Sequence, residues 1–272
     1  MRIGIVQPDI VWEDKPRNYE RVRGLVSGLG KGALDLVVLP EMFATGFSMD
    51  LARVKETAKG ETSCFLKGLA RDLDAHVLGG FVEEKGSKGL NTVALFDPRG
   101  TEVLRYVKMH PFTFGGEDRR YHRGEGPCVA RVNGVMVAPF ICYDLRFPEV
   151  FREAMALGAE VFVVPANWPN SRISHFTALL RARAIENLGC AIGVNRIGHG
   201  GGLDYDGHSV IFGPLGEELA SAGDREEVAV CELDVSVLRK TREQLGFLTD
   251  ARSDRYPHLQ AERSAEKGGV RR

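Results

Sequence analysis

The sequence predicts a mixed α/β fold, and three observations support that fold class. Short, nearly continuous apolar runs recur along the chain, as expected of strands buried inside a sheet. Segments with the apolar spacing of amphipathic helices lie between several of these runs. Two pairs of runs carry hairpin signals, one of them across the turn 97–100, and these argue against a purely parallel sheet. No linker, low-complexity tract or clear repeat divides the 272 residues, so one domain is favoured.

The elements can be assigned in chain order. The expected strands cover residues 3–7, 34–39, 76–82, 90–96, 101–107, 135–141, 161–164, 190–195, 209–212 and 228–233. The expected helices cover residues 18–29, 64–73, 149–157 and 176–188, with Thr62-Ser63 and Ser174 as N-terminal caps. Hairpins are expected for 90–96 with 101–107 and for 209–212 with 228–233, and a flexible loop for 198–202. We expect the domain to span 1–250, followed by a polar arm or disordered tail over 251–272.

Composition and charge exclude several functional classes. The net charge of −1 gives no electrostatic footprint for nucleic acid or for an anionic membrane. The five cysteines are an odd number without a C-x-x-C pair, and they are typical of reduced thiols. No signal-peptide core and no apolar run of about 18 residues is visible, so we expect a cytoplasmic protein. The seven scattered histidines and the cysteine spacing give no metal pattern, and we expect neither metal nor cofactor.

Three reactive side chains follow apolar strands. Cys142 stands between the strand 135–141 and the helix that Pro148 introduces, a turn where a helix N-terminus could stabilise a thiolate. Glu41 directly follows the strand 34–39, where partial desolvation would suit a general base. Lys108 stands where the strand 101–107 ends. Taken singly, a cysteine is more often a small buried hydrophobe and a glutamate an exposed charge, so the combination carries the argument.

The loop 112–121 is rich in aromatic residues and hinged by glycine. It either closes over a small ligand or forms a surface excursion, and the sequence does not decide between the two. Trp168 follows another predicted strand and adds an aromatic side chain to the same edge of the sheet.

The motifs around these residues closely resemble those of the carbon–nitrogen hydrolase (nitrilase) superfamily. They are Leu39-Pro-Glu-Met-Phe43, Tyr106-Val-Lys-Met-His-Pro-Phe112, Ile141-Cys-Tyr-Asp-Leu-Arg-Phe-Pro-Glu149, Pro165-Ala-Asn-Trp-Pro169, Arg181-Ala-Arg-Ala-Ile-Glu-Asn187, Asn195-Arg-Ile-Gly198 and Asp206-Gly-His-Ser209. The resemblance runs from Gln7 to about Tyr256. It implies a four-layer α-β-β-α sandwich that assembles as a homodimer or a dimer-based oligomer.

The resemblance also implies roles for four side chains and one backbone group. Glu41 would be the base that activates Cys142, and Lys108 would stabilise the oxyanion together with the N–H of Tyr143. Glu117 would orient Lys108 or the substrate amide. Thiolate attack on an amide, release of ammonia and hydrolysis of a thioester fit these residue types independently.

Within the superfamily, the cysteine and Ala-Asn-Trp-Pro motifs look most like the ω-amidase branch, which deamidates 2-oxoglutaramate and 2-oxosuccinamate. A substrate carboxylate would need a cation, for which Arg146 and Arg119-Arg120 are candidates. Arg146 could equally form a salt bridge within its own turn. The expected aromatic lining is Phe43, Phe112, Phe114 and Trp168, with Tyr143 beside the nucleophile.

Other functions fit the same motifs. An N-carbamoyl-amine hydrolase or another short aliphatic amidase is the main enzymatic alternative. An acyltransferase would use the same three residues, although its membrane-bound form would need transmembrane segments. A binding protein without catalysis is disfavoured because all three catalytic positions are filled.

Overall fold

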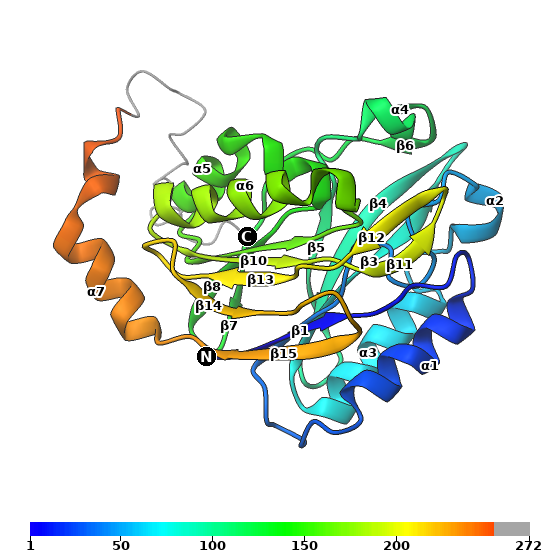
Figure 1. Cartoon of the computed structure of the whole chain (residues 1–272), viewed down its shortest axis with the longest axis horizontal. Helices are drawn as coiled ribbons and strands as arrows, with labels where there is room; N and C mark the ends of the chain where they lie inside the picture. The colour runs from blue at the N-terminus through cyan, green and yellow to red at the C-terminus, as the bar shows by residue number, and fades with distance from the viewer. Residues whose placement is uncertain (253–272) are drawn as a thin grey trace, which may run out of the picture.

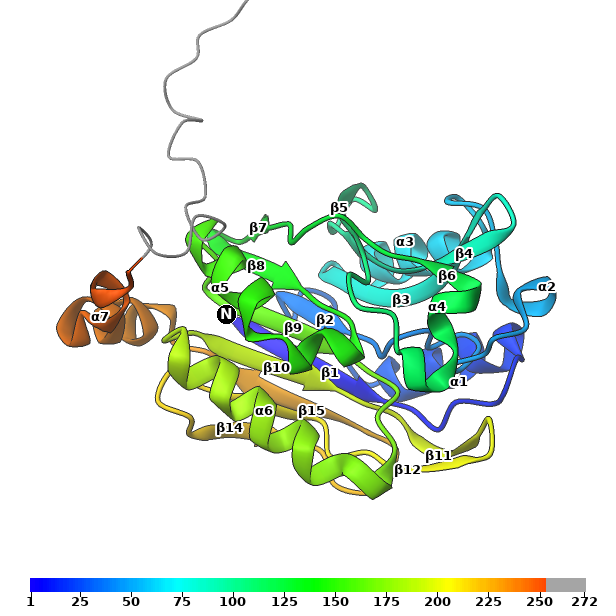
Figure 2. The ribbon, with the colours of Figure 1, turned by 90° about the horizontal axis from the view of Figure 1, so that it is seen from above.

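The computed structural model describes residues 1–252, whose elements form four layers in the order helix, sheet, sheet, helix (Figures 1 and 2). Helices α1 (Lys15–Val26) and α3 (Glu61–Leu73) cover the outer face of one sheet. Helices α5 (Pro148–Ala156) and α6 (Ile173–Glu186) cover the outer face of the other. The α-β-β-α sandwich that the resemblance implied is therefore confirmed.

The first sheet has seven strands, and the order of six of them is β15-β1-β2-β3-β4-β5, with β6 beside β4. These strands are β1 (Arg2–Gln7), β2 (Leu36–Val38), β3 (His76–Lys85), β4 (Lys88–Phe96), β5 (Glu102–Val107), β6 (Tyr121–His122) and β15 (Glu227–Glu232). The pairs β1–β2 and β2–β3 are parallel, whereas β3–β4, β4–β5 and β1–β15 are antiparallel.

The second sheet has six strands in the order β14-β13-β10-β9-β8-β7. They are β7 (Ala130–Val132), β8 (Val135–Pro139), β9 (Val161–Pro165), β10 (Cys190–Val194), β13 (Val210–Phe212) and β14 (Glu218–Ser221). Its central strands β8, β9 and β10 are parallel. A separate hairpin, β11 (Ile197–Gly200) with β12 (Leu203–Asp206), stands at the end of this sheet (Figure 1).

The side chains of each buried strand alternate between two parts of the hydrophobic core, one between the sheets and one under the helices. Leu36 and Val38 of β2 pack between the two sheets, whereas Val37 and Leu39 pack under α1 and α3. Successive side chains of a strand point to opposite faces, so a strand that is buried on both faces reads as one continuous apolar run. This is why the sequence showed short apolar blocks without a polar alternation.

The carboxyl ends of the parallel strands lie at one edge of the sandwich. Strand β5 is antiparallel to β4, which is antiparallel to β3, so β5 runs in the same direction as β2 and β3. The chain therefore leaves β2 and β5 at the same end of the first sheet, and hydrogen bonds join this end to the residues that follow β9. Ligands of open α/β sheets bind outside the carboxyl ends of parallel strands.

Two predicted features of the C-terminal half are wrong. Strand β13 pairs with β14 across the turn 213–216, and β15 pairs with β1 in the other sheet, so 209–212 and 228–233 are not a hairpin. The competing partner β14 was missed because Glu218–Ser221 is short and mostly exposed. The expected flexible loop 198–202 is instead part of the β11–β12 hairpin, in which Gly198, His199 and Gly200 pair with residues of β12 and positions 201–202 form the turn.

The predicted helix caps are also wrong. Thr62 and Ser63 lie inside α3, whose first turn is capped by the Glu56 carboxylate through the backbone N–H groups of both residues. Ser174 lies inside α6, which begins at Ile173. Helix α1 begins three residues before the predicted segment because Asp14 caps it. A capping carboxylate that is distant in sequence cannot be found from local patterns.

The chain after β15 contains elements that the sequence analysis missed. Helix α7 (Val235–Leu245) and the 3₁₀ helix η4 (Phe247–Asp250) extend away from the sandwich (Figure 1). Apart from Ala251 and Arg252, the expected C-terminal arm lies outside the described residues, and the boundary at residue 250 stays a prediction. A search of residues 1–252 for a helix of the length and apolarity needed to cross a bilayer finds none.

Candidate active site

Three buried charged groups meet between β2, β5 and the loop after β5. The Lys108 ammonium lies 2.9 Å from Oε1 of Glu41 and 2.9 Å from Oε2 of Glu117, and all three side chains are at most 1% exposed. Asn91 of β4 donates one hydrogen to each carboxylate, at 2.7 Å to Glu41 and 2.8 Å to Glu117. We call Glu41, Asn91, Lys108 and Glu117 the acid–base cluster.

Glu41 is held by groups from both sheets. It follows β2, and its Oε2 accepts the backbone N–H of Asn167 at 3.0 Å, while the Asn167 side chain donates to the backbone carbonyl of Glu41 at 2.6 Å. Gly80 of β3 permits this packing, because a Cβ there would lie 2.8 Å from the Glu41 Cα. Met42 adopts a φ of 44°, which turns the chain sharply after the carboxylate.

Cys142 opens the 3₁₀ helix η2 (Cys142–Arg146) three residues after β8. Its φ of 46° is in the left-handed region, which is uncommon for a residue with a Cβ and typical of strained functional positions. Asp144 stabilises this turn by accepting the Ile141 N–H at 3.0 Å and the Tyr106 hydroxyl at 2.8 Å. It also accepts the His110 backbone N–H at 2.9 Å, so one carboxyl group joins the cysteine turn to the segment after Lys108.

The cysteine faces the acid–base cluster through Asn167. The Cys142 thiol donates to the Asn167 carbonyl at 3.9 Å, a long contact of the kind sulfur makes, and the same asparagine binds Glu41. The helix α5 begins at Pro148, one residue before the predicted start, and the 3₁₀ helix η2 forms the turn between the cysteine and α5. The 3₁₀ turn between them is fixed by Asp144, a long-range contact that the local pattern does not reveal.

The electrostatics of the site favour a neutral thiol in the resting protein. Burial raises the pKa of Cys142 well above its ordinary value, the charge of Glu41 raises it further, and Lys108 acts in the opposite direction. Burial lowers the pKa of Lys108, but the charges of Glu117 and Glu41 outweigh it and hold that pKa well above its usual range. Lys108 therefore stays a cation, and Cys142 needs a base before it can attack.

The pKa of the second carboxyl group, Glu117, is raised from its ordinary value. Burial raises the pKa of Glu117, and the neighbouring Glu41 adds to the rise, whereas Lys108 and the hydrogen bond from Asn91 oppose it. The backbone N–H of Phe112 donates to Glu117 at 2.5 Å and fixes the loop against the cluster. The two carboxyl groups thus contact one ammonium, and the loop that carries Phe112 is fixed against them.

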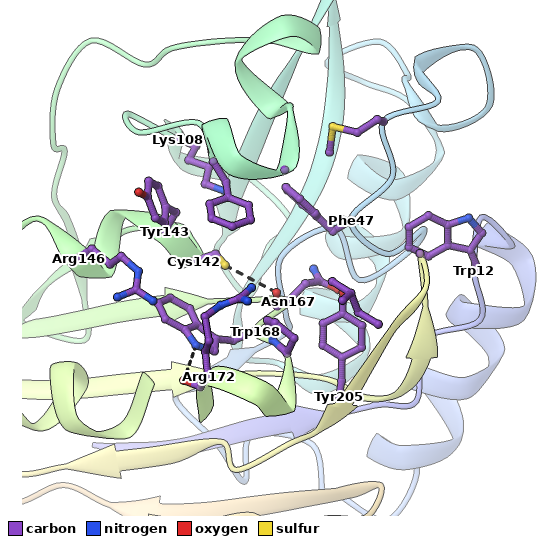
Figure 3. A pocket seen from close by; sticks show the side chains of 16 residues that line it. Trp12, Phe47, Lys108, Cys142, Tyr143, Arg146, Asn167, Trp168, Arg172 and Tyr205 are labelled. Carbon is purple, nitrogen blue, oxygen red and sulfur yellow. Dashed lines mark hydrogen bonds between the residues drawn. The ribbon is translucent and has the colours of Figure 1, made fainter. Parts of the chain in front are cut away.

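A pocket of about 320 Å³ opens above the cysteine (Figure 3). Lys108, Cys142 and Asn167 form its floor, and Phe47, Phe112 and Trp168 are among its apolar walls. The complete lining is Trp12, Phe47, Met49, Lys108, Phe112, Gly115, Cys142, Tyr143, Arg146, Asn167, Trp168, Pro169, Arg172, Gly201, Leu203 and Tyr205. A concave, mostly apolar space with a few polar groups at one point is typical of a site for a small molecule.

The structure gathers most of the predicted site residues, with exceptions. Tyr143, Arg146, Phe112 and Trp168 line the pocket as expected. Phe43 does not, because it packs in the core under α1 and α3, against Tyr19 and Phe65. The turn at Met42 directs it inward, and Phe47, five residues after Met42, supplies the wall instead.

Of the arginines predicted to bind a substrate carboxylate, one lies in the pocket and two lie outside it. Arg119 and Arg120 belong to the short helix α4 (Glu117–Arg120) and do not line the pocket. Arg146 does line it, and the salt bridge considered for it within its turn is absent from residues 1–252. Its guanidinium lies 4.9 Å from the Trp168 ring centroid and 3.3 Å from His175.

Several functional positions were missed. Asn91 and Asp144 lie in an expected strand and in the cysteine motif, and only their burial and hydrogen bonds reveal that they organise the site. Arg172 and Tyr205 come from the 3₁₀ helix η3 (Asn170–Arg172) and from β12, which no motif connects with the cysteine. Within residues 1–252, no three histidine, cysteine, aspartate or glutamate side chains gather as a metal ion would require.

Comparisons with known proteins agree with this geometry. The carbon-nitrogen hydrolase family model matches residues 2–243. The chain is 34% identical to the omega-amidase YafV of Escherichia coli (strain K12), over 92% of this chain and 96% of the relative. It is 33% identical to the 2-oxoglutaramate amidase of Bacillus subtilis (strain 168), over 93% and 98% of the two chains.

A solved structure supports the fold. The amidase from Nesterenkonia sp. AN1 superposes with a TM-score of 0.83 at 27% identity, covering 94% of this chain and 98% of that one. In that structure, a variant of the amidase carries acrylamide added to its active-site cysteine by Michael addition. From the family match along nearly the whole sequence and the agreement of the folds, the chain belongs to the carbon–nitrogen hydrolase family and is a hydrolase of carbon–nitrogen bonds.

Proposed function

We propose that this chain is an ω-amidase, which hydrolyses the terminal amide of a small carboxylate-bearing amide such as 2-oxoglutaramate or 2-oxosuccinamate. The observation that carries the proposal is the acid–base cluster beside a thiol at the floor of a small apolar pocket. The names of the two relatives support the substrate class.

In the first half of the proposed reaction, Glu41 takes the proton of the Cys142 thiol, and the thiolate attacks the amide carbonyl carbon. Lys108 Nζ and the backbone N–H of Tyr143 stabilise the oxyanion, because a fixed positive charge in a buried site costs no reorganisation when charge develops. As the tetrahedral intermediate collapses, Glu41 returns the proton to the amide nitrogen and the C–N bond breaks. Ammonia is released, and the acyl group stays on Cys142 as a thioester.

In the second half, a water molecule replaces ammonia. Glu41 takes a proton from the water as its oxygen attacks the thioester carbonyl, and Lys108 again stabilises the oxyanion. Collapse breaks the C–S bond, the proton returns to sulfur and the acid is released. Glu117 keeps Lys108 oriented through its two contacts at 2.9 and 3.2 Å.

The test is steady-state ammonia release from a panel of amides. It includes 2-oxoglutaramate, glutamine, asparagine, N-carbamoyl compounds, a short aliphatic amide and a nitrile, each assayed with the wild-type protein and with Cys142→Ala. The proposal expects the highest kcat/KM for 2-oxoglutaramate or 2-oxosuccinamate. Faster turnover of an N-carbamoyl compound or a neutral aliphatic amide would reject the ω-amidase assignment. Hydroxamate formation with hydroxylamine reports acyl transfer.

We also propose that the protein is a cytoplasmic homodimer. Five free cysteines suit a reducing compartment. Leu157 and Ile185, at the ends of α5 and α6, are 42% and 46% exposed and offer an apolar surface on the helical layer beside the nucleophile. Light scattering after size exclusion tests the dimer, and a monomer at micromolar concentration contradicts it.

A further inference from the structure

The pocket contains a cation, Arg172, that has no anionic partner within the described residues 1–252. Arg172 is partly buried in the pocket wall, and its guanidinium lies 5.8 Å from the ring centroid of Phe112. Among the hydrogen bonds and ion pairs of residues 1–252, none uses its side chain. Its backbone is anchored, because its carbonyl accepts the Trp168 indole N–H at 2.8 Å. A guanidinium in an apolar pocket is costly unless a partner satisfies its donors.

Arg146, the other arginine in the pocket, is already engaged. Its guanidinium lies between the rings of Trp168 and Tyr143, at 4.9 and 6.0 Å, and bonds to His175 at 3.3 Å. Figure 3 shows Arg146 beside these rings, whereas the Arg172 side chain extends from η3 towards the space in front of Cys142. Arg146 thus uses one donor on His175, whereas no side-chain donor of Arg172 has a hydrogen-bond partner within residues 1–252.

Tyr205 adds a second donor near Arg172. It lines the pocket from β12, which contacts η3, and its hydroxyl makes no hydrogen bond to another residue of the range 1–252. Burial raises the pKa of Tyr205 to about 12, and the charges of Arg196 and, to a smaller extent, Arg172 act in the opposite direction, so the phenol keeps its proton and can donate it. The buried guanidinium of Arg196 lies 4.6 Å from the centroid of the Tyr205 ring and holds the ring in place.

The two ends of the pocket thus differ in charge. The acid–base cluster contains two carboxyl groups and one ammonium, so it repels an anion from the floor around Cys142. Arg172 and Tyr205 offer a planar fork and a hydroxyl, which match the two oxygens of a carboxylate. We propose that Arg172 and Tyr205 bind the free carboxylate of a dicarboxylic acid monoamide and so direct its amide to Cys142. This inference deepens the proposed function and rests on it.

The experiment compares two amides that differ at one end. Glutaramate carries a carboxylate where valeramide carries a methyl group, and kcat/KM for both is measured in wild type, Arg172→Met, Arg172→Lys and Tyr205→Phe. Arg172→Met should lower the glutaramate-to-valeramide ratio roughly 10- to 100-fold, mostly through KM, as expected when a charged hydrogen-bonding pair is lost. Arg172→Lys should recover part of that ratio, because it keeps the charge but loses the fork. Tyr205→Phe should lower it about 2- to 10-fold.

Arg146→Met is the matched control, because it removes a guanidinium from the same pocket. It should change the ratio less than about threefold. If Arg146→Met abolishes the discrimination and Arg172→Met leaves it intact, the anchor is Arg146 and the inference is wrong. An unchanged ratio in both variants rejects an arginine anchor altogether.

A binding measurement separates this inference from the proposed function. Calorimetry measures glutaramate binding to Cys142→Ala and to Cys142→Ala/Arg172→Met, where no turnover occurs. A roughly 10- to 100-fold weaker affinity in the double variant supports the anchor even if the wild-type protein hydrolyses none of the ω-amides. Equal affinities overturn the anchor while leaving a measured amidase activity standing.

Discussion

The floor of the pocket differs from its rim, the part of the wall that contains Arg172, Tyr205 and Phe112, in how its side chains are held. At the floor, Lys108 and the two carboxyl groups that contact it, Glu41 and Glu117, are almost fully buried, and each is held by hydrogen bonds to neighbours from separate strands or loops. On the rim, Arg172 and Phe112 are partly exposed and contact each other mainly through a ring face. The floor is a fixed charge arrangement, whereas the rim offers donors and apolar surface to whatever enters.

The difference sets the kind of effect expected in each region. The groups at the floor act together in the proposed reaction, so removing one of them should lower kcat by orders of magnitude. Removing a group from the rim removes one contact to the substrate, so the effect should be graded and depend on the substrate.

The largest effect is expected for the nucleophile. Cys142→Ala should abolish turnover, with a loss on the order of 10⁴-fold or more, because no other group of the floor can form the thioester. The measurement is ammonia release together with mass spectrometry of the protein after iodoacetamide. The other four single Cys→Ala variants should retain most activity, and Cys64, which is exposed, is the mildest of these controls. Inactivation that follows alkylation of Cys64, Cys128, Cys190 or Cys231 would contradict the assignment.

Loss of the base should come next. Glu41→Gln should reduce kcat roughly 10²- to 10⁴-fold, because the thiol and the attacking water lose their proton acceptor. The same change removes a negative charge that raises the pKa of Cys142, so the thiolate fraction at a given pH should not fall. Iodoacetamide alkylation should therefore persist while turnover is lost. Parallel loss of both would show that Glu41 acts by shaping the site and not as the base.

The oxyanion partner should have a smaller effect with a distinct pH signature. Lys108→Met should lower kcat roughly 10²- to 10³-fold. It also removes the positive charge that lowers the pKa of Cys142, so that pKa rises further and the alkylation rate should reach its plateau at a higher pH than in wild type. Below that plateau, alkylation should be slower at every pH.

The Lys108→Met prediction needs a control for correct folding of the variant. Two buried carboxyl groups lose their shared cation, which is expected to destabilise the protein, so circular dichroism and a thermal melt must accompany the kinetics. Near-wild-type kcat in a folded Lys108→Met protein would remove this residue from the mechanism.

The sequence predicted the floor better than the rim for a physical reason. Glu41, Lys108 and Cys142 directly follow apolar strands, and parallel strands must end at a common edge. Local periodicity therefore indicated where reactive residues could meet. Arg172 and Tyr205 meet through the packing of η3 against β12, a contact between segments whose pairing no local pattern fixes.

The same limit applies to the fold. Strands buried on both faces were found because their apolar runs are continuous, as in β2 and β9. Strand β14 was missed and the partner of β13 misassigned, because a short exposed strand gives little hydrophobic signal. Phe43 was placed in the pocket because the positive φ of Met42, which directs it into the core, leaves no trace in the sequence.

The smallest effect is expected at the outer edge of the rim, in the loop 112–121. Phe114 is 88% exposed, touches Phe112 at 5.8 Å between ring centroids and does not line the pocket. Phe112, in contrast, packs on Tyr143 at 5.0 Å, and its N–H is bound by Glu117. Phe114→Ala should therefore change kcat/KM for 2-oxoglutaramate by only about twofold, as expected of an exposed side chain. A loss of tenfold or more, with an unchanged melting temperature, would show that the loop closes on the substrate and that the rim is assembled during binding.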